Sequence, residues 1–436
     1  MIKISFIGAG STIFAKNILG DVMLTPSLQN AELALYDIDE DRLAESHKML
    51  GNINKNVNKN RSKIVSYTDR KEALKDAHFV INAIQVGGYK PSTVIDFEIA
   101  KKYGLEQTIG DTLGIGGIFR ALRTIPVMLS IAEDMEEVCP NALLLNYTNP
   151  MSILTQTMLT QTNIKTVGLC HSVQGVVEEL YETIGWDYEN DKDLLRYKVA
   201  GINHMAWLLE IEKNGKNIYP LIKKEAQKLD TPHTDAVRIE LMSRFGYYVT
   251  ESSEHNAEYH PYFIKEKYPE LIDKYMIPLD EYLRRCEIQI KDWETQRDDY
   301  VNNGSLTHER SVEYGSYIMD SIVTGKSTEI AGNVLNNGLI SNLPDDAVVE
   351  VPCLVNKNGV QPTRIGELPI QLAALNRTHI NVHQLVVEAA ITKSRNKIYQ
   401  AAYLDPHTSS ELSLNDIESM VDELIEAHGD YLPEFS

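Results

Sequence analysis

The chain begins with a short apolar segment that runs directly into a glycine-containing turn, and this order constrains the fold more than any other feature. Residues 2–7 are apolar enough for a buried strand, and GAGST at residues 8–12 precedes a stretch with apolar residues at helical spacing. A strand, a tight glycine turn and a helix in this order are typical of a dinucleotide-binding α/β fold. We therefore expect a Rossmann-like N-terminal region with the helix N-terminus facing a pyrophosphate.

The turn and the next predicted strand supply the expected cofactor contacts. Gly8 suits the tight bend and Gly10 the close approach of the backbone to the pyrophosphate, and Ser11 and Thr12 begin the helix. The third glycine of the common pattern is missing, so the turn alone is a weak signal. ELALYDID reads as a second strand ending in Asp37, whose carboxylate can accept hydrogen bonds from ribose hydroxyls. This acidic residue favours NAD over NADP.

The alternation of strands and helices continues beyond this point. AHFVINAIQVGG and NALLLNYTNPM read as two further strands. Asn146, Thr148 and Asn149 follow the second, at the sheet edge where open α/β folds bind ligands, and we predict that Asn146 and Thr148 contact the cofactor. The alternative is that these polar side chains only satisfy the backbone of a turn. Between the strands, Asp111 lies in a glycine-rich segment that is either an ordinary loop or backbone close to a ligand.

A cysteine and a histidine occur at two later strand ends. VGLCHSVQG places Cys170 after an apolar run, and GINHMAW places His204 in a turn before another strand. A lone cysteine is more often a small buried hydrophobe than a ligand. Together, however, a thiolate and an imidazole suit a borderline divalent metal, and two protein ligands leave positions open for substrate. If a metal binds here, we expect a catalytic site and not a structural one.

The overall charge and the cysteine pattern exclude several classes of partner. A net charge of -20 and a pI near 5.1 disfavour nucleic acid and anionic membrane surfaces. The first apolar run is too short for a signal peptide, and no later run approaches the roughly 18 residues of a membrane span. The four cysteines form no CxxC pair and read as reduced thiols. We expect a cytoplasmic protein with a neutral or metal-chelated small-molecule ligand.

Seven ordered motifs together resemble glycoside hydrolase family 4 across essentially the whole chain: GAGST, IGDTLGIGGIFRALRTIP, NYTNPMS, GLCHSVQ, GINHMAW, AEYHPYF and NLPDDAVVEVP. This family is the NAD-dependent exception among glycosidases, most of which use two carboxylates. The resemblance implies NAD, a divalent metal that is usually manganese, and a homo-oligomer such as a dimer or tetramer. It also implies that Cys170 and His204 are the metal ligands.

The resemblance further implies a mechanism. Hydride passes from carbon 3 of the sugar to NAD+, the ketone acidifies the proton on carbon 2, and elimination expels the glycosidic oxygen. Water then adds and the hydride returns. A metal chelated by the sugar oxygens would polarise the carbonyl and stabilise the enediolate.

Roles for individual residues follow from the same resemblance. Asn149 would hold a sugar hydroxyl near the metal and Asp111 would act in the same polar shell. Tyr259 is the preferred base for the carbon 2 proton, because a phenol beside a cation can have a lowered pKa; a packed tyrosine with one hydrogen bond is the alternative. His171 would protonate the leaving oxygen, or be an ordinary loop histidine.

Glu254 and Glu258 remain alternative bases, because they lie in the same segment as Tyr259. Arg285, on a predicted helix with Arg284, would contact the substrate, although arginines on such helices more often face solvent.

The substrate class follows from two cues. CHSV resembles the α-galactosidase and α-glucosidase group, and Lys90 is the only cation near the glycine turn where phospho-sugar members carry arginine. A phosphate would need bidentate or converging cations. We expect an α-galactosidase acting on unphosphorylated, melibiose-like α-galactosides. An α-glucosidase, an α-galacturonidase, an NAD-dependent hydroxy-acid or sugar dehydrogenase and a non-catalytic NAD-responsive regulator remain alternatives.

The chain divides into two predicted domains. Residues 1–200 form an NAD-binding Rossmann-like domain, and residues 201–436 form an α+β domain for catalysis and oligomerisation. From about residue 280 the spacing becomes helical, with NLPDDAVVEVPCLV as a strand pair and a final amphipathic helix at the C-terminus. The expected architecture resembles that of lactate and malate dehydrogenases.

Overall fold

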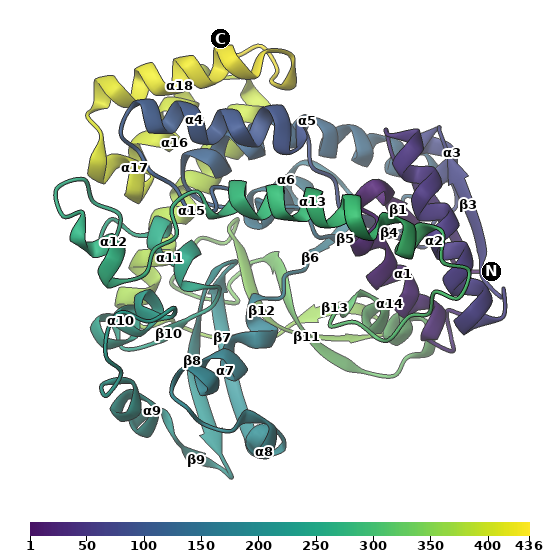
Figure 1. The fold of residues 1–436 in the computed structure, drawn as a ribbon, viewed down its shortest axis with the longest axis horizontal. Helices are drawn as coiled ribbons and strands as arrows, with labels where there is room; N and C mark the ends of the chain where they lie inside the picture. Colours follow the sequence, from purple (N-terminus) through teal and green to yellow (C-terminus); the bar gives the residue numbers. More distant parts are fainter.

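The computed structural model describes residues 1–436 and joins its strands into one 13-stranded sheet (Figure 1). The strands are β1 (Lys3–Ile7), β2 (Glu32–Tyr36), β3 (Lys63–Tyr67), β4 (Phe79–Asn82), β5 (Leu143–Asn146), β6 (Lys165–Gly168), β7 (Leu195–Ile202), β8 (Met205–Lys213), β9 (Lys216–Asn217), β10 (Tyr248–Val249), β11 (Thr328–Leu335), β12 (Val348–Asn356) and β13 (Gly359–Pro362).

Strands β1 to β6 form a parallel half in the order β3-β2-β1-β4-β5-β6. Phe79 of β4, for example, lies between Ile4 of β1 and Leu143 of β5 in register. This is the strand order of dinucleotide-binding folds, in which ligands bind at the carboxyl ends of the strands where the order reverses. The order reverses here between β1 and β4, so the Rossmann-like prediction is confirmed.

An antiparallel half extends the sheet beyond β6, in the order β11-β12-β7-β8-β10. The two halves join at one residue pair, Gly168 of β6 beside Asn333 of β11. A second narrow junction, Glu350 of β12 beside Gly201 of β7, connects the β7–β8 hairpin. A Cβ on Gly168 would lie 2.6 Å from Sδ of Met151, so only glycine fits this close approach.

Helices cover the sheet and fill the space between its halves. They are α1 (Ile13–Leu24), α2 (Glu40–Asn58), α3 (Arg70–Leu74), α4 (Val94–Lys102), α5 (Gly114–Val138), α6 (Met151–Gln161), α7 (Ser172–Thr183), α8 (Tyr188–Asp191), α9 (Tyr219–Ala226), α10 (Ala236–Phe245), α11 (Ser253–Tyr259), α12 (Glu270–Lys274), α13 (Glu281–Val301), α14 (Gly315–Thr324), α15 (Ile370–Thr392), α16 (Arg395–Leu404), α17 (Pro406–Glu411) and α18 (Leu414–His428). Four short helical turns complete the chain: η1 (Ala9–Ser11), η2 (Gly88–Thr93), η3 (Lys192–Leu194) and η4 (Gly429–Tyr431).

The longest helix, α5, is a core helix. Its length and apolar composition would allow it to cross a membrane, but 78% of its most apolar window is buried within the protein. Ile118, Phe119 and Leu122 are each at most 1% exposed and pack in one apolar cluster with α15, α16 and α18. Burial of such side chains contributes about 1.5–3 kcal/mol each. The glycine-rich segment that precedes α5 is thus held against a rigid element.

The predicted helical character of the second half is confirmed by α13 to α18. α13 runs across the molecule in front of the sheet, from the region of α11 toward α2 (Figure 1). One expectation is wrong: residues 342–355 do not form a strand pair, because only β12 lies in this segment and its antiparallel partners β11 and β13 lie outside it. The division into two domains stays a prediction, and residue 200 lies within β7.

Candidate metal and sugar site

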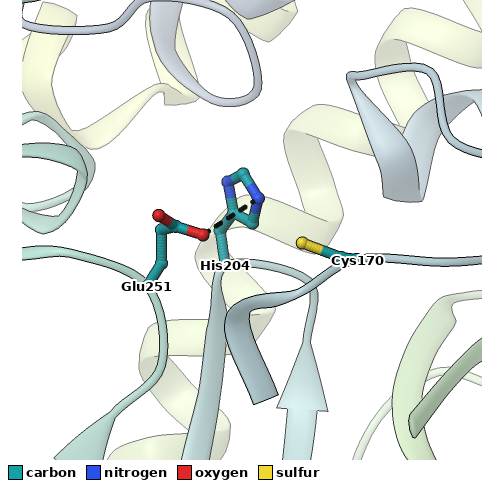
Figure 2. A group of neighbouring side chains, drawn as sticks. All are labelled: Cys170, His204 and Glu251. Carbon is teal, nitrogen blue, oxygen red and sulfur yellow. Dashed lines mark ion pairs between the residues drawn. The ribbon is translucent and has the colours of Figure 1, made fainter. Parts of the chain in front are cut away.

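Three side chains with metal-binding atoms meet beyond the end of β6 (Figure 2). Sγ of Cys170, a ring nitrogen of His204 and a carboxylate oxygen of Glu251 all lie within 4.8 Å of one another. Nε2 of His204 is 3.4 Å from Oε2 of Glu251. This donor set suits a borderline divalent metal, and three protein ligands leave positions open for substrate. The structure therefore brings the predicted pair together and adds Glu251.

The three donors come from separate elements that the sheet brings together. Cys170 follows β6, and His204 lies in the two-residue turn between β7 and β8. Glu251 follows β10, which pairs antiparallel with β8 so that Val249 lies opposite Trp207. Because β8 begins directly after His204, this pairing places Glu251 beside the imidazole.

His204 and Glu251 both adopt a backbone conformation that residues other than glycine rarely adopt. Each has a φ of 64°, in the left-handed region that favours glycine. Such strain persists only where the surrounding structure over-determines it, and it concentrates at functional sites. Two strained ligand residues beside each other support a functional reading of the cluster.

The charges in the cluster favour a cation at its centre. Burial disfavours the charge of Glu251, but His255 and His204 outweigh burial and hold its pKa at about 2. Burial likewise opposes protonation of His204, but Glu251 and Cys170 raise its pKa to about 10. The site thus stabilises positive charge, which a divalent metal would supply in exchange for the imidazole proton.

The predicted base, Tyr259, lies against this cluster. It ends α11, is 1% exposed, and its hydroxyl lies 3.0 Å from Nδ1 of His204. Burial raises the pKa of Tyr259 well above its ordinary value, and the charges of Asp111 and Glu258 raise it further. A phenolate here therefore requires a cation in the neighbouring cluster.

The two alternative bases are engaged elsewhere. The carboxylate of Glu258 accepts hydrogen bonds from three successive backbone N–H groups, those of Thr108 (2.8 Å), Ile109 (3.2 Å) and Gly110 (2.8 Å). Glu254 accepts a hydrogen bond from Nη2 of Arg285 at 2.5 Å. Among the three candidates, only Tyr259 contacts the metal-binding cluster.

Asp111 and Asn149 lie together, as the resemblance implied. Nδ2 of Asn149 donates to Oδ2 of Asp111 at 3.3 Å, and the hydroxyl of Thr112 donates to Oδ1 at 2.7 Å. Oδ1 of Asn149 is buried without a partner. A buried acceptor without a partner is costly, so this atom is available for a ligand hydroxyl.

His171, the predicted acid, lies beside the cluster with its side chain 46% exposed. Its Nε2 is 2.9 Å from Oε2 of Glu313, whose side chain is 4% exposed. The carboxylate of Glu313 raises the pKa of His171. Glu313 thus holds the imidazole in place and favours its protonated form.

Arg285 and Arg284 are paired with carboxylates of the protein. Nε of Arg285 donates to Glu281 at 2.6 Å, and its second contact is to Glu254, while Arg284 also pairs with Glu281. The Arg285 side chain is 42% exposed. Its role as a substrate contact stays a prediction.

The turn after β1 has the geometry expected of a dinucleotide cradle. Gly8 has a φ of 90°, and a Cβ there would lie 2.6 Å from the carbonyl oxygen of Ala83. The backbone N–H of Gly10 donates to Oδ2 of Asp37 at 2.6 Å, so the carboxylate lies directly beside the turn. Oγ of Ser11 is buried without a partner, while the Thr12 hydroxyl donates to the carbonyl oxygen of Gly10.

Asn146 and Thr148 form a buried network with Asn82. Nδ2 of Asn82 donates to Oδ1 of Asn146 at 2.9 Å and to Oγ1 of Thr148 at 3.1 Å. Thr148 in turn donates to the carbonyl oxygen of Ile84. These contacts account for much of the polarity at the strand ends, and contact with the cofactor stays a prediction for both residues.

Sequence reasoning missed several residues at the site. Glu251 and Glu313 have no spacing that connects them to Cys170 or His204, because strand pairing and loop packing bring them there. Glu251 lies three residues before Glu254, in the segment that was expected to supply the base, and this position was the only signal for it.

The comparisons with known proteins identify the family. Residues 3–186 match the family 4 glycosyl hydrolase profile, and residues 199–408 match the family 4 glycosyl hydrolase C-terminal domain. The chain belongs to family 4 of the glycosyl hydrolases.

Individual relatives agree with this assignment. The chain is 61% identical over 436 residues, the full length of both proteins, to an alpha-galactosidase of Bacillus subtilis (strain 168). Among solved structures, a putative glucosidase of Bacillus subtilis has a TM-score of 0.85 and 27% identity, covering 98% of this chain and 100% of that chain. A 6-phospho-alpha-glucosidase from gut microorganisms, solved with NAD and Mn2+, has a TM-score of 0.82 at 22% identity, covering 100% of both chains.

The fold prediction also finds support in a more distant likeness. Malate dehydrogenase from Plasmodium falciparum has a TM-score of 0.53 at 15% identity, covering 90% of this chain and 99% of that chain. At this identity only the fold is shared, and it confirms the predicted dehydrogenase-like architecture.

Proposed function

We propose that this protein is an α-galactosidase that cleaves unphosphorylated α-galactosides with the help of NAD and a divalent metal, preferably manganese. The observation that carries the proposal is the 61% identity, over the whole of both chains, to the alpha-galactosidase of Bacillus subtilis. The cluster of Cys170, His204 and Glu251 beside Tyr259 supports it with a matching chemical site.

The residues present fit both groups. Cys170, His204 and Glu251 would hold the metal, because their donor atoms, a sulfur, a nitrogen and an oxygen, lie close together. Gly8 and Gly10 would admit the pyrophosphate of NAD, and Asp37 would accept hydrogen bonds from the ribose. When bound, NAD accepts and returns the hydride of carbon 3, and the metal polarises the oxygens of carbons 2 and 3.

The protein's own groups then move protons and orient the sugar. The phenolic oxygen of Tyr259 takes the proton of carbon 2. Because Nε2 of His171 is held by Glu313, it is Nδ1 of the imidazolium that donates a proton to the departing glycosidic oxygen. Glu313 keeps that imidazole oriented. Oδ1 of Asn149 accepts a hydrogen bond from a sugar hydroxyl. Asp111 accepts a hydrogen bond from Nδ2 of the same amide and so orients it.

The surroundings of Lys90 support an unphosphorylated substrate. Lys90 lines an exposed depression of about 350 Å³ together with Glu287, Glu294 and Lys291. The two carboxylates balance the two ammonium groups, so this region offers no excess of positive charge for a phosphate dianion.

The proposed compartment and assembly follow from the same chemistry. All four cysteines are free, and a thiolate ligand at Cys170 needs a reducing compartment, so we place the protein in the cytoplasm. We further propose a homo-oligomer, a dimer or tetramer, with no nucleic-acid or membrane partner, in keeping with the net charge of -20.

The test is a panel of aryl α- and β-glycosides, including galactosides, glucosides and galacturonides, with and without NAD+, Mn2+ and a thiol reductant. We expect cleavage of the α-galactoside that needs all three additions, with no net reduction of NAD+ and with solvent deuterium entering carbon 2. Cleavage without such exchange would contradict the proposed elimination.

A matched pair of cysteine variants completes the test. Cys170→Ser should abolish turnover and leave NAD+ binding by calorimetry unchanged, whereas Cys139→Ser, a buried cysteine away from the cluster, should keep activity. Full activity of Cys170→Ser would remove the metal site from the mechanism. Net accumulation of NADH would instead identify a dehydrogenase.

A further inference from the structure

Arg120, on α5, differs from the other buried arginines in its partners. Three arginines are buried, Arg120 at 8% exposure, Arg123 at 1% and Arg238 at 5%. Arg123 donates to both carboxylate oxygens of Asp96, at 3.2 and 2.7 Å. Arg238 pairs with two carboxylates, those of Asp235 and Glu179. Arg120 forms no ion pair.

The guanidinium of Arg120 has most of its donors free. Its one hydrogen bond runs from Nη1 to the hydroxyl of Tyr282, at 3.3 Å. A guanidinium carries five N–H donors, and buried donors are almost always paired because burying an unpaired charge is costly. The unpaired nitrogens are absent from the fully enclosed polar atoms that lack a partner, so they face accessible space. Their acceptors must therefore come from water or from a bound ligand.

The guanidinium of Arg120 lies near a residue already assigned to the sugar site. Arg120 is close enough to Asp111 for the two charges to interact, and Asp111 also feels the charges of His255 and His204. Asp111 holds Asn149, whose free Oδ1 was assigned above to a sugar hydroxyl. Arg120 therefore lies near the groups already assigned to the substrate.

Contacts with α13 hold the guanidinium of Arg120 in place before a ligand binds. Cζ of Arg120 lies 5.9 Å from the centre of the Tyr282 ring, and the backbone N–H of Tyr282 donates to the carbonyl oxygen of Thr108 at 3.0 Å. The segment that carries Asp111 and the helix that carries Tyr282 are thus tied together. A preorganised guanidinium loses little conformational freedom on binding.

We propose that Arg120 and Asp111 form a charge-balanced donor and acceptor pair that recognises the hydroxyl groups of a neutral sugar, with Arg120 donating to two neighbouring sugar oxygens. The inference rests on the proposed glycosidase function and identifies Arg120 as a residue that contributes to its substrate specificity. A sugar hydroxyl both donates and accepts, so it can satisfy both charged groups, and a planar guanidinium binds two adjacent oxygens at once. Because the two charges balance, a carboxylate or phosphate on the sugar would leave an uncompensated negative charge beside Asp111, which favours a neutral hexose.

The test compares Arg120→Met and Arg120→Lys with Arg284→Met, a matched control whose guanidinium lies on the surface with 62% of its side chain exposed. We expect Arg120→Met to lower kcat/KM for the aryl α-galactoside about 10- to 100-fold, since a hydrogen bond to a charged group is lost. Arg120→Lys should recover part of the rate, and Mn2+ and NAD+ affinities by calorimetry should stay unchanged.

Deoxy substrates separate a sugar contact from a purely structural role. With the wild-type protein, removing the hydroxyl held by Arg120 should cost about as much as the Arg120→Met substitution, and the two losses should not add. Equal penalties for every deoxy sugar in both proteins, or a parallel loss of NAD+ affinity, would overturn the proposal. A larger effect of Arg120→Met on an α-galacturonide than on the α-galactoside would show that the pair recognises a carboxylate, which also overturns it.

The proposed function can fail without deciding this inference. If the wild-type protein cleaves another neutral aryl glycoside, the same comparison is made with that substrate and its deoxy analogues. If Arg120→Met does not fold, Arg120→Lys and the deoxy series still measure the contact.

Discussion

The hydroxyl of Tyr314 accepts a hydrogen bond from the backbone N–H of Cys170 at 3.0 Å and lies 2.7 Å from the carbonyl oxygen of the same residue, to which it donates. One phenol thus fixes the peptide groups on both sides of the thiol. Tyr314 comes from the segment just before α14, far from Cys170 in sequence, and is 5% exposed. Groups that orient a metal ligand without touching the metal contribute strongly to affinity.

Tyr314→Phe should therefore weaken Mn2+ binding about 10- to 100-fold, because the loop that carries Cys170 loses its anchor while the thiol remains. Calorimetric titration with Mn2+ measures the effect, and saturating Mn2+ should restore much of the activity. Tyr181→Phe is the control, because Tyr181 is fully buried with an unpartnered hydroxyl and belongs to the separate cluster around α7. Unchanged Mn2+ affinity in Tyr314→Phe would contradict this role.

Glu251 is the donor that sequence reasoning did not find, and its substitution tests the three-donor cluster. Glu251→Gln keeps the size of the side chain but removes the carboxylate charge, so Mn2+ affinity should fall at least about tenfold. Glu254→Gln, in the same segment but paired with Arg285, should leave Mn2+ binding unchanged. Equal Mn2+ affinities of the two variants would restrict the protein ligands to Cys170 and His204.

Glu258 is expected to position the segment that carries Asp111. Its carboxylate collects three successive N–H groups of that segment, and glutamine would supply one acceptor oxygen and an amide group that donates where an acceptor is needed. Glu258→Gln should lower kcat by about tenfold or more and leave Mn2+ affinity intact, since an unsatisfied buried group costs ~1–3 kcal/mol. Steady-state kinetics together with calorimetry measure both quantities. A loss of all activity with an unchanged melting temperature would instead favour Glu258 as the base.

Local patterns were enough to predict the parallel half of the fold. The turn at Gly8 and Gly10, the acidic end of the second strand at Asp37 and the alternation of strands and helices all express local chemistry, and the strand order agrees with them. Cys170 and His204 were also accessible, since each ends a strand in a motif that resembles a known family. The part that sequence reasoning did not reach depends on pairing between distant segments.

Glu251 shows why those contacts were missed. It reaches the cluster only because the two-residue strand β10 pairs with β8. A strand this short has no hydrophobic periodicity from which it could be predicted. Arg120 is a second case. Both arginines lie in the same long apolar helix, and only the absence of a carboxylate partner in the folded protein distinguishes Arg120 from Arg123.

Two buried histidines near α11 predict how stability depends on pH. His260 and His383 are 1% and 3% exposed, and Nε2 of each has no hydrogen-bond partner. Burial, together with the charge of the neighbouring His379, lowers the pKa of both to about 3. Because the folded pKa lies below the unfolded value of ~6.5, each histidine takes up a proton on unfolding at mildly acidic pH. The stability they contribute is present above ~6.5 and is lost as the pH falls toward about 3.

The free energy of unfolding should accordingly fall by up to ~1.4 kcal/mol per pH unit for each of these histidines once the pH is below ~6. His383→Gln cannot take up this proton, so its pH slope between about pH 6 and pH 5 should be shallower than the wild-type slope by close to one proton. Urea titrations at several pH values measure the slope, and His47→Gln, at a half-buried histidine on α2, should leave it unchanged. Parallel slopes for wild type and His383→Gln would mean that His383 is already protonated in the folded protein over this range, which would contradict the prediction.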